Sequence, residues 1–285
     1  MQFSLKVFAI LSCLLFALPT FVGAQETGDK ELKILFIGNS YTFYNSLDKT
    51  VGDMLTVSGV PTKTVRSLPG GWSFERHFKG ELPNNFKGEP TPEVIKKEKW
   101  DYVVLQEQSA AAINNHAKFM EYGKKLVDLI HENCPETKVV FYQTWGRCDG
   151  MFEGYGDDES RKAEVVAAWT KRYSAPDETT LAQLKVGMQG SYEELREATD
   201  SMLAPVGKAF FTVGDKLDLH SDEGDQKPHH PNPRGTYLAG CVFFKTITGK
   251  SPVGLWKKLA DADKAPKVEE NDAEYLEKVA DQVVE

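Results

Sequence analysis

The sequence predicts an α/β protein, a three-layer α/β/α flavodoxin-like domain with a parallel sheet of about five strands. Short apolar segments alternate with longer amphipathic segments along the chain, without internal repeats or low-complexity linkers. Several of the apolar segments are followed by Gly, Asn, Gln or Ser, polar or turn-forming residues that are typical of the loops after strands. Because ligands of open α/β sheets collect at the carboxyl edge of the strands, we expect a functional site at that edge.

The beginning of the chain has the features of a secretory signal. Lys6 precedes an apolar run at residues 7–21, and small residues follow at 22–24. We interpret residues 1–24 as a signal peptide and residues 25–285 as a single domain, with a secreted or periplasmic location. The run is too short for a membrane span and no later run approaches that length, so we expect no stable membrane insertion.

Charge and cysteine content limit the possible partners and the type of scaffold. The chain of 285 residues has a formal net charge of −8, which argues against a nucleic-acid partner. After residue 24 the cysteines are Cys134, Cys148 and Cys241, so at most one disulfide can form. Cys134 and Cys148 flank an expected strand and could pair, whereas Cys241 lies in an apolar helix and is expected in the core. The sequence leaves the oligomeric state open.

The first half of the domain contains three expected strands, each followed by turn-forming or polar residues. The strands are expected at residues 32–37, 62–68 and 102–105. The first runs into Gly38–Ser40, the second ends at Pro69–Ser73, and the third runs into Gln106–Ser109. Apolar residues at helical spacing predict helices at residues 47–57, 93–99 and 115–133.

The second half is less regular. A strand is expected at residues 138–145, and an elaborated loop at 146–180, with a short helix near 163–170, because Gly, Asp, Tyr and Trp interrupt the apolar period. The remaining elements are expected as a helix at 181–203, a last strand and turn at 204–210, a buried helix at 235–248 and two short final helices. An acidic loop containing His and Pro, residues 218–233, precedes the buried helix.

Ser40 is the candidate nucleophile. It follows a buried strand and the turn-prone Gly38 and Asn39, near a helix start whose free backbone N–H groups can stabilise a developing anion. Attack by serine on an ester also requires a base and a carboxylate that orients it, and the loop at 218–233 contains His229 and His230 together with acidic residues. The structural alternative is that Ser40 only caps the helix.

Four blocks of the sequence, in this order, resemble those of the SGNH hydrolase superfamily, also called GDSL-like esterases and lipases. Gly38–Ser40 stands where that family has its nucleophile motif, and Gly71–Ser73 matches the glycine block that supplies a backbone donor. Leu105–Ser109 falls at the block written Gly-x-Asn-Asp in many members, and His230–Ala239 resembles the block in which the base precedes Pro and a helix. The resemblance covers most of residues 25–285.

The resemblance implies Ser40 as nucleophile and His230 as base. It also implies that the backbone N–H groups of Ser40 and Gly71 donate to the oxyanion. The family's Asn in the third block is replaced here, so we assign Gln106 as the side-chain donor of the oxyanion hole, since an amide can still donate.

The orienting carboxylate departs from the family pattern. The family places its Asp three residues before the His, and that position is Lys227 here. Asp225, five residues before His230, is therefore our assignment, and Asp222 is the alternative if the intervening residues bulge out.

No metal or organic cofactor is expected. His229 and His230 with acidic neighbours could form a metal site, but adjacent His side chains diverge in an extended loop. Trp72 and Trp145 are interpreted either as cleft walls for a sugar ring or as buried packing. The other histidines have no ligating spacing and are expected at surface or hydrogen-bonded core positions: His77, His116, His131 and His220.

The resemblance implies a serine esterase that hydrolyses short acyl esters, acetyl foremost, on carbohydrates, and the predicted signal peptide makes it an exported one. The expected partner is a small-molecule or polysaccharide ester. The alternative is a non-catalytic glycan-binding protein on the same fold, which the altered third block and the displaced carboxylate favour. A third hypothesis is a flavodoxin-like module that binds a phosphate ligand through the amides after the first strand.

Overall fold

The structure, a computed structural model, describes residues 30–108, 111–145, 180–220 and 230–285. The chain divides into two units, Met1–Lys30 and Glu31–Glu285, and the second contains the sheet and its helices. No helix among these described residues is long and apolar enough to cross a membrane. The predicted signal peptide at 1–24 and the elaborated loop at 146–180 lie outside the described residues, except for Thr180.

The sheet has five strands, and every pairing between neighbours is parallel. The strands are β1 (Leu32–Ile37), β2 (Thr62–Ser67), β3 (Tyr102–Leu105), β4 (Lys138–Tyr142) and β5 (Met202–Ala204). Their order in the sheet is β2-β1-β3-β4-β5, which is the flavodoxin-like order. The predicted fold class is confirmed. Since the order reverses between β1 and β3, the crevice between their carboxyl ends is the topological switch point where such sheets bind ligands.

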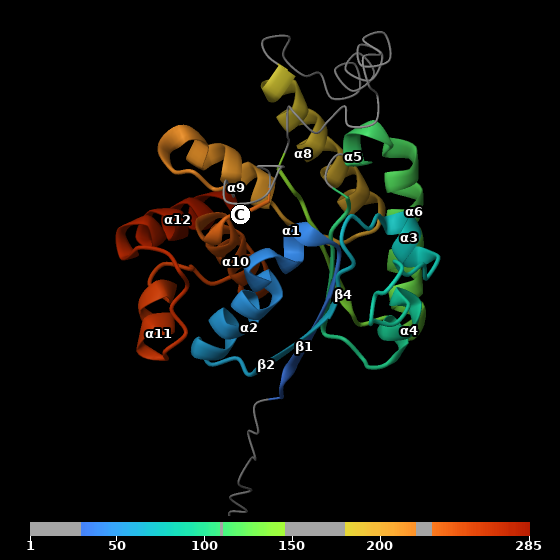
Figure 1. Ribbon diagram of the computed structural model, residues 1–285, viewed down its shortest axis with the longest axis horizontal. Helices are drawn as coiled ribbons and strands as arrows, with labels where there is room; N and C mark the ends of the chain where they lie inside the picture. The colour runs from blue at the N-terminus through green and yellow to red at the C-terminus, as the bar shows by residue number, and fades with distance from the viewer. Residues whose placement is uncertain (1–29, 109–110, 146–179, 221–229) are drawn as a thin grey trace, which may run out of the picture. The chain divides into compact units, whose positions relative to one another are not determined.

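Helices cover both faces of the sheet, and Figure 1 shows α2 and α9 to α12 on one side with α3 to α6 on the other. The helices of the first side are α2 (Leu47–Val57), α9 (Val206–Val213), α10 (Pro233–Thr248), α11 (Leu255–Asp261) and α12 (Glu270–Val283). The other side has α3 (Phe74–Phe78), α4 (Thr91–Lys96), α5 (Ala111–Asn114), α6 (His116–Asn133) and α8 (Thr180–Ala198). Between β1 and α2 lie α1 (Ser40–Phe43) and a 3₁₀ turn, η1 (Tyr44–Ser46), and a second one, η2 (Gly214–Lys216), follows α9.

Alternation along the strands divides the apolar residues into two cores. Ile34 and Phe36 of β1 pack in the core under α2 and α10, whereas Leu35 and Ile37 pack in the core under α6 and α8. A strand that is buried on both faces has to be apolar at nearly every position, which is why the central strands are continuous apolar runs. Cys241 is buried in the first core, as predicted.

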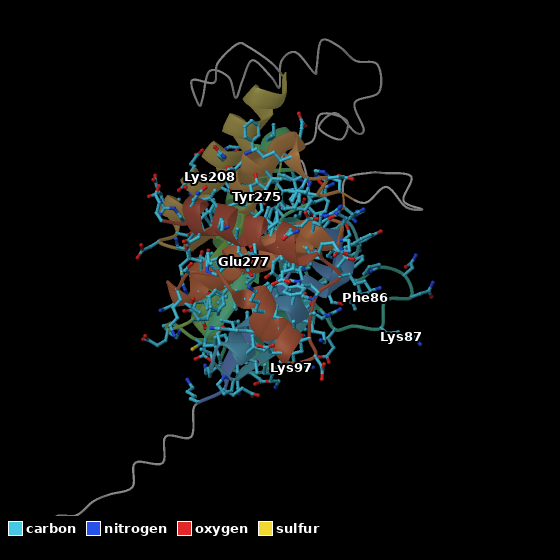
Figure 2. All side chains as sticks on the ribbon, turned by 90° about the vertical axis from the view of Figure 1, so that its left-hand side faces the viewer. Phe86, Lys87, Lys97, Lys208, Tyr275 and Glu277 are labelled. Carbon is cyan, nitrogen blue, oxygen red and sulfur yellow. The ribbon has the colours of Figure 1, made fainter. Side chains whose placement is uncertain are left out.

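The layer of α10, α11 and α12 is tied together by a buried carboxylate. Figure 2 views this layer from outside, with Glu277 of α12 near its middle. Glu277 accepts hydrogen bonds from the hydroxyl of Tyr237 at 2.6 Å and from the backbone N–H groups of Gly254 and Trp256, both at 2.7 Å. These bonds connect α10, which begins just after His230, to α11 and α12.

The predicted boundaries around β5 are wrong. The helix expected to reach residue 203 ends at Ala198. The last strand, expected with its turn into a short helix at 204–210, is Met202–Ala204, and the helix that follows is α9. A turn with Asp200 at a φ of 49° separates α8 from β5. Leu203 belongs to a strand rather than to the helix because residues 202–204 pair with β4. The short helices α3 and α5 were not expected from the apolar pattern.

Candidate active site

Ser40 is the first residue of α1, immediately after the carboxyl end of β1. The residue that caps α1 is Asn39, whose Oδ1 accepts from the N–H of Tyr41 at 3.2 Å. The alternative in which Ser40 only caps the helix is therefore wrong. The half-buried Ser40 hydroxyl lies at the helix start, and the first amides of a helix have no intrahelical acceptor.

Gly38 is required because two segments approach each other closely. A Cβ atom at this position would lie 2.7 Å from Oε1 of Gln106 and 3.1 Å from Oγ1 of Thr42. The space a side chain would need is thus occupied by the end of β3. We infer that Gly38 sets the distance between the turn that holds Ser40 and the third strand.

The side chain of Gln106 lies beneath this turn and is fully buried. Its Oε1 accepts from the N–H of Asn39 at 2.9 Å and from the Thr42 hydroxyl at 3.0 Å. Its Nε2 donates to Oδ1 of Asn39 at 3.0 Å and to the carbonyl of Glu107. Both amide hydrogens are used inside the protein, so these contacts support a positioning role for Gln106 rather than the predicted donation to an oxyanion.

The loop with Gly71 is fixed to the nucleophile turn. Nδ2 of Asn39 donates to the carbonyl of Trp72 at 2.9 Å, and the N–H of Trp72 donates to the carbonyl of Pro69 at 3.4 Å. Gly71 has a φ of 71°, in the left-handed region that favours glycine. The loop is exposed at Gly71, where we predicted an oxyanion donor, and buried at Trp72. One asparagine, next to Ser40, thus connects the first and second blocks.

His77 also supports this turn, and its role was missed in the sequence. It is completely buried in α3, with Nε2 2.9 Å from the carbonyl of Gly38 and Nδ1 2.7 Å from the hydroxyl of Thr91. A carbonyl can only accept, so Nε2 is protonated and the ring accepts at Nδ1. Burial lowers the pKa of His77 to about 4 and keeps the ring neutral. From the sequence, His77 was expected only at a surface or hydrogen-bonded core position, because its spacing does not suggest a ligand.

His230 lies against the segment that begins with Ser40. Its ring stacks on Tyr44, with centroids 4.0 Å apart and planes 4° apart, and meets the edge of Tyr41 at 5.6 Å. Asn45 holds the adjacent residue, since its Nδ2 donates to the carbonyl of Pro231 at 2.8 Å. Nδ2 of Asn45 also donates to the hydroxyl of Thr236, a residue 191 positions later in the sequence. These bonds bring two distant parts of the chain together beside Ser40.

The segment after His230 is held from its other side as well. Oδ1 of Asn232 caps α10 by accepting from the N–H of Gly235 at 3.0 Å. The N–H of Asn232 donates to the carbonyl of Leu219 at 2.9 Å, and His220 forms an isolated β-bridge with Pro231. The position of His230 is therefore set by both α10 and the residues before 221.

The aromatic residues near the site are packed rather than exposed. Trp145 lies between Tyr41, with centroids 4.6 Å apart, and Phe210, with centroids 4.1 Å apart, and both pairs are stacked. Both faces of its ring are covered, so of the two interpretations of Trp145 its contacts favour buried packing. Trp72 is buried beneath the guanidinium of Arg76, which lies 4.8 Å from the ring centroid.

A cavity of about 630 Å³ lies at the carboxyl ends of β4 and β5. Its lining includes Gln143 and Trp145 after β4, Phe210 of α9, and Asp218 and His220. Gln143 is 2% exposed, and its Oε1 has no hydrogen-bond partner among the described residues. The cavity borders the Ser40 region through Trp145, which stacks on the residue next to Ser40. It offers a partly open volume with polar side chains in its lining.

No family model matches the chain, and no curated protein matches it in sequence. Solved structures do match it in fold. A DUF4886 family protein from Bacteroides uniformis has a TM-score of 0.62 and 17% identity over 89% of this chain and 95% of that one. A candidate SGNH hydrolase from Slackia heliotrinireducens has a TM-score of 0.55 and 22% identity over 76% of this chain and 99% of that one. This chain has the SGNH-hydrolase fold. A family 3 carbohydrate esterase from Clostridium thermocellum has a TM-score of 0.50 and 13% identity over 77% and 96%.

Within this SGNH-hydrolase fold, all four predicted blocks lie at the carboxyl edge of the sheet or just before α10. The contacts bring together the first three blocks through Asn39 and Gln106, and the ring of His230 packs against Tyr41 and Tyr44 in the segment that begins with Ser40. Asp225, Asp222 and His229 lie outside the described residues, so the orienting carboxylate remains a prediction. In the described part of the chain, no group of three or more His, Cys, Asp or Glu residues could hold a metal ion.

Proposed function

We propose that this chain is an exported serine esterase that hydrolyses short acyl esters, acetyl foremost, on carbohydrates. The observation that supports it most is the placement of His230 against Tyr41, which lies in the helix that begins with Ser40, and against Tyr44, which directly follows that helix. A hydroxyl at a helix start, an imidazole packed against the same segment and an exposed glycine loop connected to it form the set that acyl transfer requires. The SGNH-hydrolase fold is consistent with this use.

The proposed reaction has two halves. The Ser40 hydroxyl oxygen attacks the acyl carbonyl carbon while His230 takes its proton, and the resulting oxyanion is held by the backbone N–H groups of Ser40 and Gly71. The intermediate then breaks its bond to the alcohol oxygen, which receives the proton from His230 and leaves an acyl-Ser40 ester. Water, deprotonated by His230, hydrolyses that ester and releases the acid. Asp225, or Asp222, would orient His230 during both halves.

Carbohydrate substrates are proposed from two observations. The fold likeness includes a structure described as a family 3 carbohydrate esterase. The lining of the cavity beside Trp145 includes the amide side chain of Gln143 and the carboxylates of Asp215 and Asp218, and such groups suit the many hydroxyl groups of a sugar. In an acetylated sugar the alcohol is much larger than the acyl group. We therefore propose that this cavity binds the sugar part of the substrate.

The first experiment tests the nucleophile. Ser40→Ala should abolish hydrolysis of aryl acetate esters and of acetylated sugars, while the free energy of unfolding changes little. Ser58→Ala is the matched control, since Ser58 lies at the end of α2 and its hydroxyl has no partner among the described residues. Turnover retained in Ser40→Ala would refute the assignment.

Covalent labelling separates the esterase from the glycan-binding alternative. A fluorophosphonate should modify Ser40 in the wild-type protein, and mass spectrometry of the labelled peptide should locate the adduct there. A protein that leaves Ser40 unmodified but is retained by an acetylated polysaccharide column would instead be a binder on the same fold. Competition by inorganic phosphate for labelling would point to the phosphate-binding hypothesis.

Export is proposed from the first residues of the sequence. Expression of the full chain in a bacterium should yield a processed protein outside the cytoplasm whose amino-terminal residue is Gln25. Full-length protein retained in the cytoplasm would contradict this part of the proposal without affecting the chemistry.

A further inference from the structure

The carboxyl end of β3 places two consecutive polar side chains on the two components of the proposed oxyanion hole. Gln106 holds the turn that contains Ser40, as described above. Glu107, buried beside it, accepts from the N–H of Phe74 at 3.1 Å with each of its carboxyl oxygens, and from the N–H of Gln108 at 2.5 Å. Phe74 is the first residue of α3, three positions after Gly71.

The loop of Gly71 is thereby fixed at two points. The carbonyl of Trp72 is held by Asn39, and the N–H of Phe74 is held by Glu107. Ser73, the N-cap residue of α3, makes no side-chain capping bond, and Glu107 accepts from Phe74, one of the first amides of the helix that have no intrahelical acceptor. Gly71 itself is exposed, with a positive φ, and depends on these two neighbours for its position.

The hydrogen bonds of Glu107 and its burial favour opposite protonation states. Each contact recorded for its carboxyl group within the described residues comes from a backbone N–H donor, which suits the carboxylate. Burial disfavours the charge, outweighs these donors and raises the pKa of Glu107 to about 8. The group is therefore expected to change charge near pH 8.

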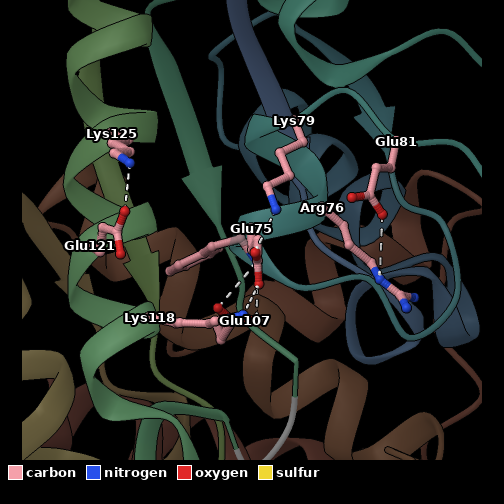
Figure 3. A network of polar contacts seen from close by, with 9 residues as sticks. Glu75, Arg76, Lys79, Glu81, Glu107, Lys118, Glu121 and Lys125 are labelled. Atoms are coloured by element: carbon pink, nitrogen blue, oxygen red, sulfur yellow. Dashed lines mark hydrogen bonds and ion pairs between the residues drawn. The ribbon is translucent and has the colours of Figure 1, made fainter.

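The charged and titratable groups around Glu107 come from three helices, and Figure 3 shows Glu75 and Lys118 beside it. Glu75 of α3 adds a negative charge that disfavours the Glu107 carboxylate, and hydrogen bonds from Lys118 of α6 and from Lys79 lower the pKa of Glu75 to about 2. Glu75 thus stays charged throughout the relevant range. Tyr192 of α8 faces Glu107, and burial raises the pKa of its hydroxyl, so it stays neutral.

We propose that Glu107 is a positioning residue that fixes the Gly71 loop relative to Ser40 through the first amide of α3, and that its loss of a proton strengthens this hold. This inference rests on the proposed function for its effect on catalysis. The hold itself is a property of the folded chain and can be measured without any substrate.

The test is a pH titration of backbone amides by NMR, compared between the wild type and Glu107→Gln. In the wild type, the amide resonances of Gly71, Phe74 and Gln108 should shift together with a midpoint near pH 8, and the shift should be absent in Glu107→Gln. Glu75→Gln is the control, because it removes a neighbouring charge while leaving the bond to Phe74. Amides that do not titrate in the wild type, or that titrate unchanged in Glu107→Gln, overturn the proposal.

The kinetic arm measures kcat and KM for an aryl acetate from pH 6 to 9.5. Glu107→Gln should keep one acceptor for Phe74, lose the increase in kcat centred near pH 8, and leave KM within about twofold. Glu107→Ala should lower kcat by about 10- to 100-fold, the usual consequence of losing a charge-assisted bond. A wild-type kcat profile in Glu107→Gln overturns the catalytic consequence. Absence of all esterase activity and of Ser40 labelling refutes the proposed function instead, and the amide titration still decides whether Glu107 holds the loop.

Discussion

The two halves of the carboxyl edge are built differently. Between β1 and β3, the side chains of Asn39, His77 and Gln106 all have partners inside the protein, and Gln106 alone makes four hydrogen bonds. Next to β4 and β5 the edge instead borders a cavity of about 630 Å³ whose lining includes Gln143, and Oε1 of Gln143 has no partner among the described residues. The comparison teaches that one half fixes the position of the reacting groups, whereas the other is available to a ligand. Substitutions in the first half should therefore lower kcat, and those in the second should raise KM.

The largest effect is expected from Gly38→Ala. The added Cβ would lie 2.7 Å from Oε1 of Gln106, so the turn or the amide has to move. Overpacking of this kind costs about 1–3 kcal/mol of stability. A displacement of Ser40 by about 1 Å is enough to lower kcat by about 100-fold. Urea unfolding and aryl acetate hydrolysis measure the two consequences.

Gly70→Ala is the matched control for this substitution. Its Cβ would meet only a phenyl carbon of Phe43 at 3.9 Å, an ordinary contact. Gly38→Ala with wild-type stability and kcat would show that the first half tolerates movement, and the distinction between the halves would fail.

The second effect concerns the pH dependence of stability through His77. Its pKa is lowered from 6.5 to about 4 in the folded protein, so the unfolded chain binds the proton more readily between these values. The contribution of His77 is fully present above pH 6.5 and is lost as the pH falls toward 4. His77→Gln keeps a donor for the carbonyl of Gly38 without the titration. The stability difference between wild type and variant should therefore decrease by about 2 kcal/mol from pH 7.5 to pH 5.

The comparison with the variant is necessary because Glu107 acts in the opposite direction. Its raised pKa stabilises the folded state as the pH falls from about 8 toward 4.5, in both proteins. Subtracting the two unfolding free energies removes this common contribution. A difference that stays constant between pH 5 and 7.5 would show that His77 does not remain neutral in the folded protein.

A smaller effect is expected at Asn45, which connects the nucleophile segment to the segment of His230. Asn45→Gly keeps a residue that tolerates the φ of 51° but removes the bonds to the carbonyl of Pro231 and the hydroxyl of Thr236. Because the loss of such hydrogen bonds costs about 0.5–1.5 kcal/mol each, kcat/KM should fall by about 10-fold. Asn85→Gly, at a residue with a φ of 68° elsewhere in the chain, should leave kcat/KM unchanged.

The sequence predicted the parallel sheet and the first blocks of the site because these depend on local signals. The apolar run at β1, the turn residues after it and the helical spacing of α2 and α6 are all readable within short windows. The role of Gln106 could not be read in this way. Its side chain meets Asn39 because Ile37 pairs with Leu105 in the sheet, and register between strands that are distant in sequence is a tertiary property.

The same reason explains His77 and Glu107. Each bonds to backbone groups of another segment, Gly38 for His77 and Phe74 for Glu107, so neither leaves a spacing pattern in the sequence. Asp225 was predicted to orient His230 because it lies five residues before it in the sequence. No contact of the described residues tests this prediction. Trp145 had two interpretations in sequence, and only its two stacked neighbours decide for packing.

The smallest effect is expected in the second half of the edge, at Gln143. Gln143→Leu removes a buried acceptor without a partner, so the free energy of unfolding should not decrease. With an acetylated sugar that enters the cavity, KM should rise by about 5-fold while kcat stays within about twofold, since a bond of about 1 kcal/mol to the bound alcohol is lost equally in the ground and transition states. With a small aryl acetate, both constants should be unchanged. A fall in kcat for both substrates would mean that Gln143 positions the reacting groups, as Gln106 does, and that the two halves of the edge share one role.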